Sequence, residues 1–351
     1  MAETTRTAEL PESSDRLGVG IGSIQVAVLL FVFADLLMKD LLGVFPVWQL
    51  QFLRSFLGLI PFVLIAWLFL GANAFKAQRP GLHLIRGILG FIAYSTYYVA
   101  LSYMPIAQTA ALFYTSPILI TLFSAPMLGE KLGIHRILAV VIGFCGVMVI
   151  LRPDADGFNP YSLLPILCAV CYAISMIIIR RAAVTESAVT VAFYTNVSFA
   201  SFSLLASGIG WSFLPEVPPD GPLNALLKPW TSPQENQWLM LGVLALSGVL
   251  GHLLIAKAYR SAPASVIAPF DYTYLVWAPI LAYLILGEVP AHSTLVGIAM
   301  IMGSGLYIGY RESRTRRKGG APPTAESIIL PNTTPRTPPA SPAEEVRQGD
   351  D

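Results

Sequence analysis

The sequence predicts an all-α polytopic membrane protein with ten transmembrane helices, arranged as two inverted repeats of five helices. Three observations lead to this prediction. Of the 351 residues, 55% are hydrophobic and only 12% are charged, whereas roughly a quarter of the residues of a soluble domain are charged. The apolar residues gather in long runs, and a pattern in the first half of the chain recurs in the second half.

Ten apolar runs follow one another along the chain. Crossing about 30 Å of hydrocarbon takes roughly 20 helical residues, and each run is about that long. The predicted spans cover residues 21–43, 46–70, 84–103, 105–127, 133–151, 161–180, 187–211, 237–258, 263–286 and 291–310. The segments that separate the runs are marked by charge, Pro or Gly. Pro117 and Pro279 are expected to kink the fourth and ninth spans.

The two sides of the predicted bundle differ in positive charge. Lys and Arg concentrate in the cytoplasmic loops of membrane proteins. With loops assigned alternately, the outer side holds only Lys39, Arg152 and Lys228. The inner side holds Arg6, Arg16, Lys76, Arg79, Arg86, Lys131, Arg136, Arg180, Arg181, Lys257, Arg260, Arg311, Arg314, Arg316, Arg317 and Lys318. Both termini are therefore predicted to be cytoplasmic.

An internal repeat divides the chain. YTSPILITLFSAPMLGE begins at Tyr114 and YTYLVWAPILAYLILGE at Tyr272, and each is followed by a His and a span that contains Gly. Because each copy has an odd number of spans, the second enters the membrane upside down, as in secondary transporters. We predict the first repeat over residues 21–155 and the second over residues 156–310. Glu130 and Glu288 then end equivalent helices on the inner and outer side.

Three segments are too polar to span a membrane. Residues 1–20 contain acids and Pro without an apolar core, so they are predicted to be a short cytoplasmic arm and not a signal peptide. The Pro-rich segment of about 212–237 is predicted to be an outer loop that is partly ordered as a cap. Residues 311–351 are first basic and then rich in Pro, Ser and Thr, so we expect a disordered cytoplasmic tail.

Four charges, Asp35, Lys39, Asp40 and Arg54, interrupt the first two spans. Asp35 and Arg54 lie about equally far from the turn near residue 44, which places them at one depth on neighbouring helices. An unpaired charge at mid-membrane costs about 2.5–3.5 kcal/mol, so we expect the two to face each other or a wet cavity. They form either a structural ion pair or a site for solute or protons. Lys39, one turn beyond Asp35 and nearer the outer surface, is a third solute-binding candidate.

His252 and Asp271 are placed almost symmetrically about the turn near Ser261, so they are predicted to share a depth. A His titrates near neutral pH and a neighbouring carboxylate biases its titration, which makes the two residues candidates for proton coupling. A neutral His that donates one hydrogen bond to Asp271 for packing alone is the alternative.

Aromatic side chains form the last group of candidates. Tyr94 and Tyr114 are equally distant from the turn near Met104, which places both phenols near the bilayer centre, where each needs a partner or a cavity. Their rings would suit a flat, partly aromatic solute. The predicted solute-binding aromatic residues are Tyr94, Tyr98, Tyr114, Tyr272 and Trp277.

Other classes of function lack support in the residues. The net charge of +1 is nearly balanced, whereas a nucleic-acid-binding face needs an excess of clustered cations, so no nucleic-acid partner is expected. A His-Glu-x-x-His zinc motif and an ATP-binding Gly-x-x-x-x-Gly-Lys-Ser/Thr loop are both missing, so we expect neither an enzyme nor a cofactor. Cys145, Cys168 and Cys171 lie in apolar runs and predict no metal site. A channel or a structural membrane protein is the alternative from another class, although buried charges in inverted repeats favour alternating access.

Several motifs together resemble the drug/metabolite transporter superfamily, in its EamA-type branch. They are ADLLMK in the first span, QFLRSF in the second, the Arg-Gly pair that opens the third, ALSYMPIAQTAAL into the fourth, and Leu-Gly-Glu closing the fourth and ninth. The resemblance covers about residues 21–310. In HLIRGILGF, and from GFNPYSLLPILCAVCYAIS to AFYTN, the chain is most similar to bacterial members that take up S-adenosylmethionine-like or riboflavin-like compounds. The long outer loop and the extended tail depart from the family pattern.

We therefore expect a secondary transporter that carries a small polar or amphipathic metabolite across a bacterial inner membrane by alternating access. The solute would bind in a central cavity between the two repeats, with a proton as the candidate coupling ion. An exporter of the same fold, of the amino-acid efflux type, is the alternative. The sequence leaves the solute and the direction open, and it is compatible with a monomer or a homodimer.

Overall fold

The computed structural model describes residues 13–69, 77, 79–128, 133–152, 158–182, 188–213, 221–262 and 264–318. Within these residues the protein is helical and has no strand. Most of the predicted arm and tail, and Glu130, lie outside them. The helices are α1 (Ser13–Leu42), α2 (Val47–Phe69), α3 (Pro80–Tyr103), α4 (Ile106–Phe113), α5 (Ser116–Leu128), α6 (Ile134–Leu151), η2 (Pro160–Ser162), α7 (Leu163–Ala182), α8 (Ala188–Phe213), α9 (Pro222–Leu227), α10 (Glu235–Ser261), α11 (Ala264–Asp271), α12 (Tyr274–Leu286) and α13 (His292–Lys318).

Nine helical stretches of the described residues are long and apolar enough to cross a membrane. The remaining predicted span corresponds to α8, whose 26 residues include no charged side chain. The prediction of an all-α membrane protein is confirmed. Two ends differ from the prediction: α1 begins at Ser13, inside the predicted arm, and α13 continues to Lys318, beyond the predicted last span.

The fourth and ninth spans are each broken into two helices. α4 ends at Phe113 and α5 begins at Ser116, while α11 ends at Asp271 and α12 begins at Tyr274. Pro117 lacks the N–H that would bond to the carbonyl of Phe113, so the helix cannot continue regularly across this point. Pro279 lies inside α12, several residues after the second break. Of the two prolines that were expected to kink a span, Pro117 therefore lies close to the break of the fourth span, whereas Pro279 lies after the break of the ninth.

The helix starts repeat at one constant offset. α4, α5 and α6 begin at Ile106, Ser116 and Ile134, and α11, α12 and α13 begin at Ala264, Tyr274 and His292. The packing is reciprocal as well: α1 lies along α10, and α7 lies along α3. Since α1 and α7 open the two repeats and α3 and α10 are their third spans, the two contacts are equivalent. An internal twofold relation between five-span units follows.

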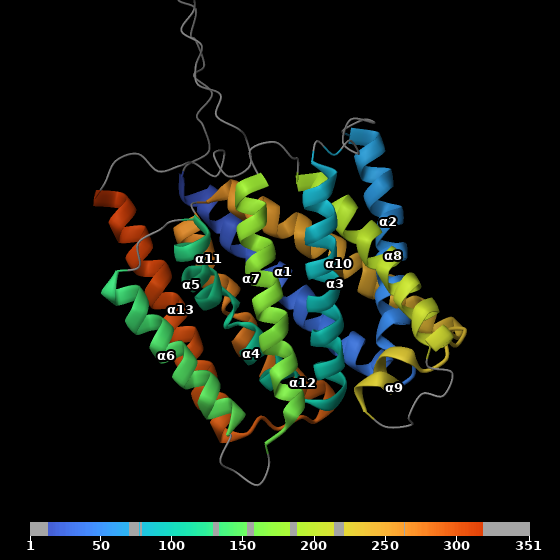
Figure 1. Ribbon diagram of the computed structural model, residues 1–351. Helices are drawn as coiled ribbons and strands as arrows, with labels where there is room; N and C mark the ends of the chain where they lie inside the picture. Colours follow the sequence, from blue (N-terminus) through green and yellow to red (C-terminus); the bar gives the residue numbers. More distant parts are fainter. Residues whose placement is uncertain are drawn as a thin grey trace, which may run out of the picture.

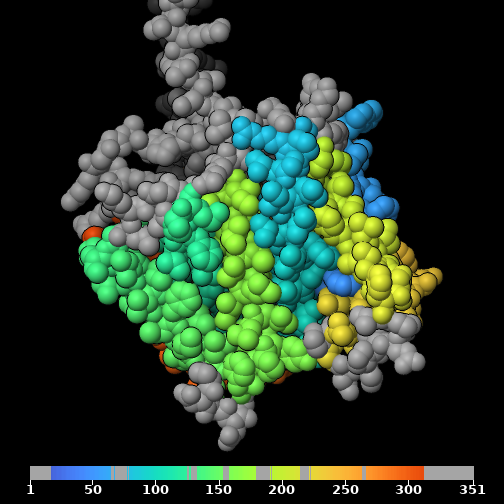
Figure 2. All heavy atoms as spheres, viewed as in Figure 1, coloured from blue at the N-terminus to red at the C-terminus, as the bar shows by residue number. Residues whose placement is uncertain are grey.

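The helices form two walls around a central region (Figure 1). The first wall contains α1, α10 and α12, and the second contains α3, α4 and α7. α2 and α8 join the walls at one side, and α6 and α13 lie together at the other. Figure 2 shows α6, α7, α3 and α8 following one another across one face of the molecule. Each wall combines helices of both repeats, so the central region lies between exchanged helices and not between two separate five-helix bodies.

We call the end of the bundle where α1 begins and α13 ends the terminal end, and the opposite end, which carries α9, the loop end (Figure 1). Part of the predicted outer loop is ordered there as a cap. Lys228 Nζ donates to the carbonyls of Leu42 (3.4 Å) and Gly43 (3.5 Å), and burial against this turn lowers the pKa of Lys228. The Gln49 side chain donates to the carbonyl of Thr231 (2.5 Å) and accepts from its N–H (3.1 Å).

Candidate functional site

Asp35 lies in the central region, on α1. Its Oδ2 atom accepts one hydrogen bond from the hydroxyl of Tyr97 on α3 (2.7 Å) and one from the hydroxyl of Tyr274 on α12 (2.6 Å). Both tyrosines are buried, whereas Asp35 keeps part of its surface accessible. Two donors on one oxygen stabilise an ionised carboxylate. The other oxygen, Oδ1, accepts no hydrogen bond from the described residues.

Arg54 reaches the same region from α2. Its Nη1 atom donates to the hydroxyl of Tyr98, and its guanidinium carbon lies 5.7 Å from the ring centroid of Tyr94 and 6.0 Å from that of Tyr98. Ring faces attract cations at such distances. Gly248 of α10 lies on the other side, where a Cβ would stand 3.4 Å from Nη2. Among the described residues only Nη1 has a hydrogen-bond partner, so most of the five N–H donors remain available.

Asp35 and Arg54 do not form the ion pair that their equal depth suggested. They are close enough to interact electrostatically, but no ion pair joins them within 4.0 Å, whereas Lys39 forms one with Glu288. Two adjacent tyrosines of α3 explain the difference, because Tyr97 bonds to the acid and Tyr98 to the base. The interior position of both charges agrees with the prediction, and their direct pairing does not.

The polar side chains at the centre keep accessible surface although they point inward. Asp35, Arg54, Tyr94 and Trp277 are all half-buried, and their contacts are with neighbouring helices. A side chain that is turned toward the interior and yet remains accessible borders a space between helices. Asp35, Arg54, Tyr94 and Trp277 thus border a polar region between the helices, which we call the central space. The rings of Tyr98, Tyr114 and Tyr272 are buried beside it.

The two broken spans meet beside this space. Tyr114 follows α4 and Tyr272 follows α11, and their ring centroids lie 5.7 Å apart. The Tyr114 ring also stacks on Tyr274 at 5.4 Å, and its hydroxyl donates to the backbone carbonyl of Asp271 (3.2 Å). Broken helices that meet near mid-membrane are the places where many transporters hold solutes and ions.

A threonine hydroxyl closes each break. Thr115 Oγ1 donates to the carbonyl of Leu112 (2.7 Å), and Thr273 Oγ1 donates to that of Phe270 (2.6 Å). A carbonyl freed by an interrupted helix must find a donor inside the protein, and a hydroxyl on the next turn supplies one. The Tyr-Thr pair that starts both copies of the repeated pattern therefore marks the two breaks.

Gln25 ties α1 to the second break. Its Nε2 atom donates to Thr273 Oγ1 (3.1 Å) and to the carbonyl of Phe270 (3.5 Å), and its Oε1 atom accepts from Trp277 Nε1 (3.5 Å). Trp277, a predicted solute-binding residue, therefore directs its N–H toward α1 and keeps its ring half-buried.

His252 and Asp271 are not brought together. His252 Nδ1 is hydrogen-bonded to the carbonyl of Gly248 (2.7 Å), and its ring meets Phe31 edge-on at 5.4 Å. Asp271 ends α11, is half-buried, and its carboxylate has no hydrogen bond or ion pair with the described residues. The predicted pair is therefore wrong. Equal distance from a turn indicates equal depth, but α11 packs mainly on α1 and α13 and not along α10.

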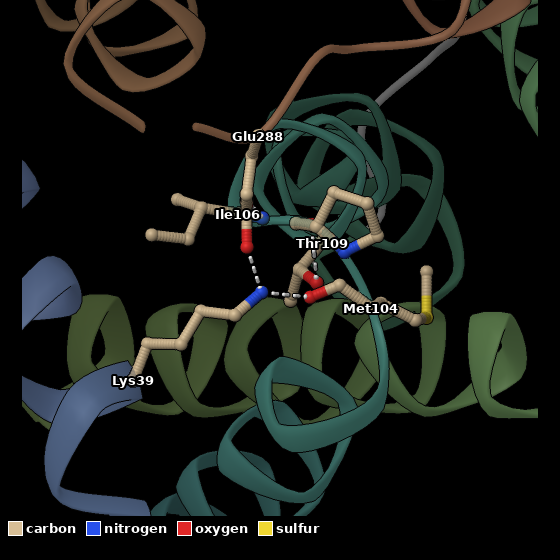
Figure 3. Close-up of polar contacts among 6 residues, drawn as sticks. Lys39, Met104, Ile106, Thr109 and Glu288 are labelled. Atoms are coloured by element: carbon tan, nitrogen blue, oxygen red, sulfur yellow. Dashed lines mark hydrogen bonds and ion pairs between the residues drawn. The ribbon is translucent and has the colours of Figure 1, made fainter. Parts of the chain in front are cut away.

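Lys39 lies at the loop end, one turn beyond Asp35. Its Nζ atom forms an ion pair with Glu288 and donates to the carbonyl of Met104 (2.6 Å), as Figure 3 shows. We predicted that Lys39 binds solute, but the structure engages its charge with Glu288 instead. Glu288 ends the ninth span, as predicted, and its carboxylate meets the start of α4.

Gln25 was not predicted, and Tyr97 and Tyr274 belong to the tyrosines of the third and ninth spans but were not chosen as solute-binding residues. A depth comparison could have found Tyr97, because it lies six residues before the end of α3 while Asp35 lies seven before the end of α1, and both helices end at the loop end. Tyr274 and Gln25 gave no such signal, since their positions depend on where the ninth span breaks.

Comparison with known proteins connects these features to a family. The profile of the EamA-like transporter family matches residues 18–152 and, a second time, residues 159–310. The two matches coincide with the two five-span units.

Several relatives align with most of the chain. The S-adenosylmethionine uptake transporter of Rickettsia bellii is 29% identical over 86% of this chain and 96% of its own. The riboflavin transporter of Vibrio cholerae is 32% identical over 70% of this chain and 77% of its own. The pseudopaline exporter CntI of Pseudomonas aeruginosa is 26% identical over 82% and 95%. A solved crystal structure, 22% identical, covers 86% of this chain and 99% of its own with a TM-score of 0.57, and it shares the fold.

Proposed function

The chain belongs to the EamA-like transporter family, and we propose that it moves its solute by alternating access through the polar central space. As a member of that family it is an integral membrane transporter of small metabolites. One observation supports the proposal most directly. Asp35 and Arg54 carry opposite charges beside the accessible space, and neutral hydroxyls satisfy each of them only in part. Both groups retain bonding capacity for a ligand.

Arg54 binds an anionic group of the solute, a carboxylate or a phosphate, because its planar fork suits both. Oδ1 of Asp35 accepts a hydrogen bond from a donor or cationic group of the same solute. A flat ring of the solute stacks on the aromatic side chains beside the space. These are Tyr94, Tyr98, Tyr114, Tyr272 and Trp277.

The solute is therefore a small amphipathic metabolite with a charged head and a ring. Two relatives are named for uptake of S-adenosylmethionine and of riboflavin, and we propose a compound of this kind, taken up by the cell. Export is the second candidate, because a third relative is named as an exporter.

Alternating access fits the way in which the site is assembled. Asp35 and Tyr274 belong to the first wall, and Tyr97 belongs to the second. Movement of one wall against the other changes these contacts, so a solute that bridges the walls is coupled to the movement. The terminal end, which carries Arg311, faces the cytoplasm of a bacterium and the loop end faces outward, in accord with the positive-inside rule.

Asp271 is the proposed proton-coupling residue. Its carboxylate stands at the C-terminus of α11 without a partner among the described residues. The negative end of the helix dipole disfavours a second negative charge, and a bound proton removes that conflict. His252, which is exposed and whose hydrogen bond within the described part of the chain is to the carbonyl of Gly248, is the second candidate.

The first experiment measures thermal stabilisation of the purified protein by S-adenosylmethionine, riboflavin, nucleosides, polyamines and aromatic amino acids. A ligand that binds only the folded state stabilises it by about 2.7 kcal/mol at a concentration of 100 times Kd. Asp35→Asn and Arg54→Gln should lose the shift. Asp40→Asn and Lys257→Gln, which change exposed charges on spanning helices, should keep it.

Uptake of the stabilising compound into proteoliposomes then tests transport. If the compound stabilises Asp35→Asn and Arg54→Gln as strongly as the wild type, the central site is refuted. If the wild type binds a compound but carries none across the bilayer in either direction, alternating access of that compound is refuted.

A further inference from the structure

A charged cluster joins three segments at the loop end (Figure 3). Lys39 Nζ forms an ion pair with Glu288 Oε1 and donates to the carbonyl of Met104 (2.6 Å). The other carboxylate oxygen, Oε2, accepts the backbone N–H of Ile106 (2.9 Å), which is the first residue of α4. The side chains of Lys39 and Glu288 are 21% and 18% exposed. The cluster is therefore shielded by the bundle and still within reach of water.

The backbone directs Glu288 to this position. α12 ends at Gly287 in the left-handed conformation (φ 70°). The N–H groups of Gly287 and Glu288 donate to the carbonyls of Tyr283 (3.1 Å) and Ala282 (3.2 Å). Glycine adopts this turn without steric cost. The chain leaves α12 sharply, and the carboxylate reaches the first turn of α4, where unpaired N–H groups and the helix dipole attract it.

The bonds of this cluster cross between the two walls. Lys39 on α1 and Glu288 after α12 belong to the first wall, whereas Met104 and Ile106 connect α3 with α4 in the second. The cluster lies one helical turn beyond Asp35, between the central space and the loop end. We propose that it is the gate of the loop end, closed in this structure and required to open whenever the central site faces that end. This inference rests on the proposed alternating access.

A gate needs bonds that break and form again at little cost. Lys39 and Glu288 already keep about a fifth of their side-chain surface in contact with solvent, so water replaces their partners readily when the walls separate. Other contacts at the loop end differ in kind. Tyr103 stacks on Tyr161 at 4.2 Å and donates to the carbonyl of Gly221 (2.7 Å). These contacts of Tyr103 add to those of the gate.

Cys168 offers a native reporter for the gate. It is buried on α7 and interacts electrostatically with Asp35, Tyr94 and Tyr98, which places its thiol beside the central space. A membrane-impermeant maleimide reaches this thiol from the loop end only when that end is open.

The test uses the full-length protein with Cys145→Ser and Cys171→Ser, in right-side-out and inside-out membrane vesicles. The maleimide is applied to one face at a time, and the rate at which Cys168 is labelled is measured. The variants are Lys39→Gln, Glu288→Gln and Lys39→Arg, with Asp40→Asn as the matched control. Asp40 neighbours Lys39 on α1 and is exposed.

We expect Lys39→Gln and Glu288→Gln to raise labelling from the loop end roughly two- to tenfold. That is the shift in the population of the open state expected on losing a partly solvated ion pair that is made only in the closed state. Lys39→Arg, which keeps the ion pair, should stay near the wild-type rate. Glu288→Gln retains an acceptor for the N–H of Ile106, so it tests the ion pair even if Lys39→Gln fails to fold.

Two outcomes separate the gate from the function on which it rests. Labelling from the loop end that rises no more in the two Gln variants than in Asp40→Asn refutes the gate. Labelling from the terminal end that rises together with labelling from the loop end in the two Gln variants, where alternating access requires it to fall, refutes alternating access itself.

Discussion

One methyl group on α13 should disturb the second helix break. A Cβ on Gly305 would collide with the hydroxyl and the ring of Tyr272, standing 2.8 Å from Cε1 and closer still to the two atoms beyond it. Tyr272 is buried, and its ring is held against Tyr114 at a centroid distance of 5.7 Å. The ring cannot turn aside without moving the centre of the site. Gly305→Ala therefore tests the packing of the break.

The magnitude follows from two opposing effects. Overpacking a filled interior costs about 1–3 kcal/mol, and replacing a helical Gly by Ala returns at most about 1 kcal/mol. Because the clash is with a buried ring, the upper end of the first range applies, and Gly305→Ala should reduce the free energy of unfolding by about 2 kcal/mol. Gly303 lies two residues earlier on the same helix, and a Cβ there meets nothing within 4 Å. Gly303→Ala is the matched control, and it should be neutral or stabilising.

Thermal unfolding in detergent and initial uptake rates in proteoliposomes measure the two consequences. Gly305→Ala should show a lower Tm and slower uptake than the wild type, because Tyr272 stands where the two broken spans meet. Gly303→Ala should match or exceed the wild type in both. If the two alanine variants have the same Tm and the same uptake rate, the packing described for Tyr272 is incorrect.

Three further outcomes are expected. Tyr97→Phe removes one of the two donors to the central carboxylate and should lower the free energy of unfolding by about 1.5–3 kcal/mol. The control is Tyr94→Phe, which keeps its ring beside the guanidinium, and equal stability of the two variants would contradict the hydrogen bond. Asp271→Asn should abolish accumulation driven by a pH gradient in proteoliposomes but preserve counterflow exchange, and unchanged accumulation would exclude it as the coupling residue. Gln49→Glu replaces a donor by an acceptor at the cap, so limited proteolysis within residues 221–234 should accelerate; wild-type cleavage rates would show that the cap is held elsewhere.

Much of the architecture is visible in local properties of the chain. The length of each apolar run sets the spans, and the two Tyr-Thr to Leu-Gly-Glu patterns mark equivalent helices. A charge inside an apolar run is costly in lipid wherever the run lies, so the interior location of Asp35 and Arg54 follows from their immediate sequence neighbours. Even the helix breaks leave a trace, since Thr115 and Thr273 sit at matching places in the two patterns.

The partners of those charges do not follow from the local sequence. Distance from a turn gives the depth of a residue, and depth alone suggested that Asp35 would pair with Arg54 and His252 with Asp271. Which side chains meet also depends on the rotation of each helix about its axis and on which helix lies beside it, and both are set by the packing of the whole bundle. The exchange of α1 and α7 between the repeats brings Asp35 on α1 to Tyr274, and the packing of α3 against the first two helices brings Tyr97 and Tyr98 to the two charges.

Lys39 shows the same difference between what the local sequence predicts and what the packing of the bundle decides. Its place one turn beyond Asp35 suggested a role in the same site, and its neighbours in the sequence give no indication of the distant acid that binds it. That acid is Glu288, which reaches the cluster because α12 ends in a left-handed glycine beside the start of α4. The spans and their repeat follow from hydrophobic length and local pattern, which each segment carries with it. The tyrosine-held charges and the loop-end cluster arise only when segments distant in the chain are packed together.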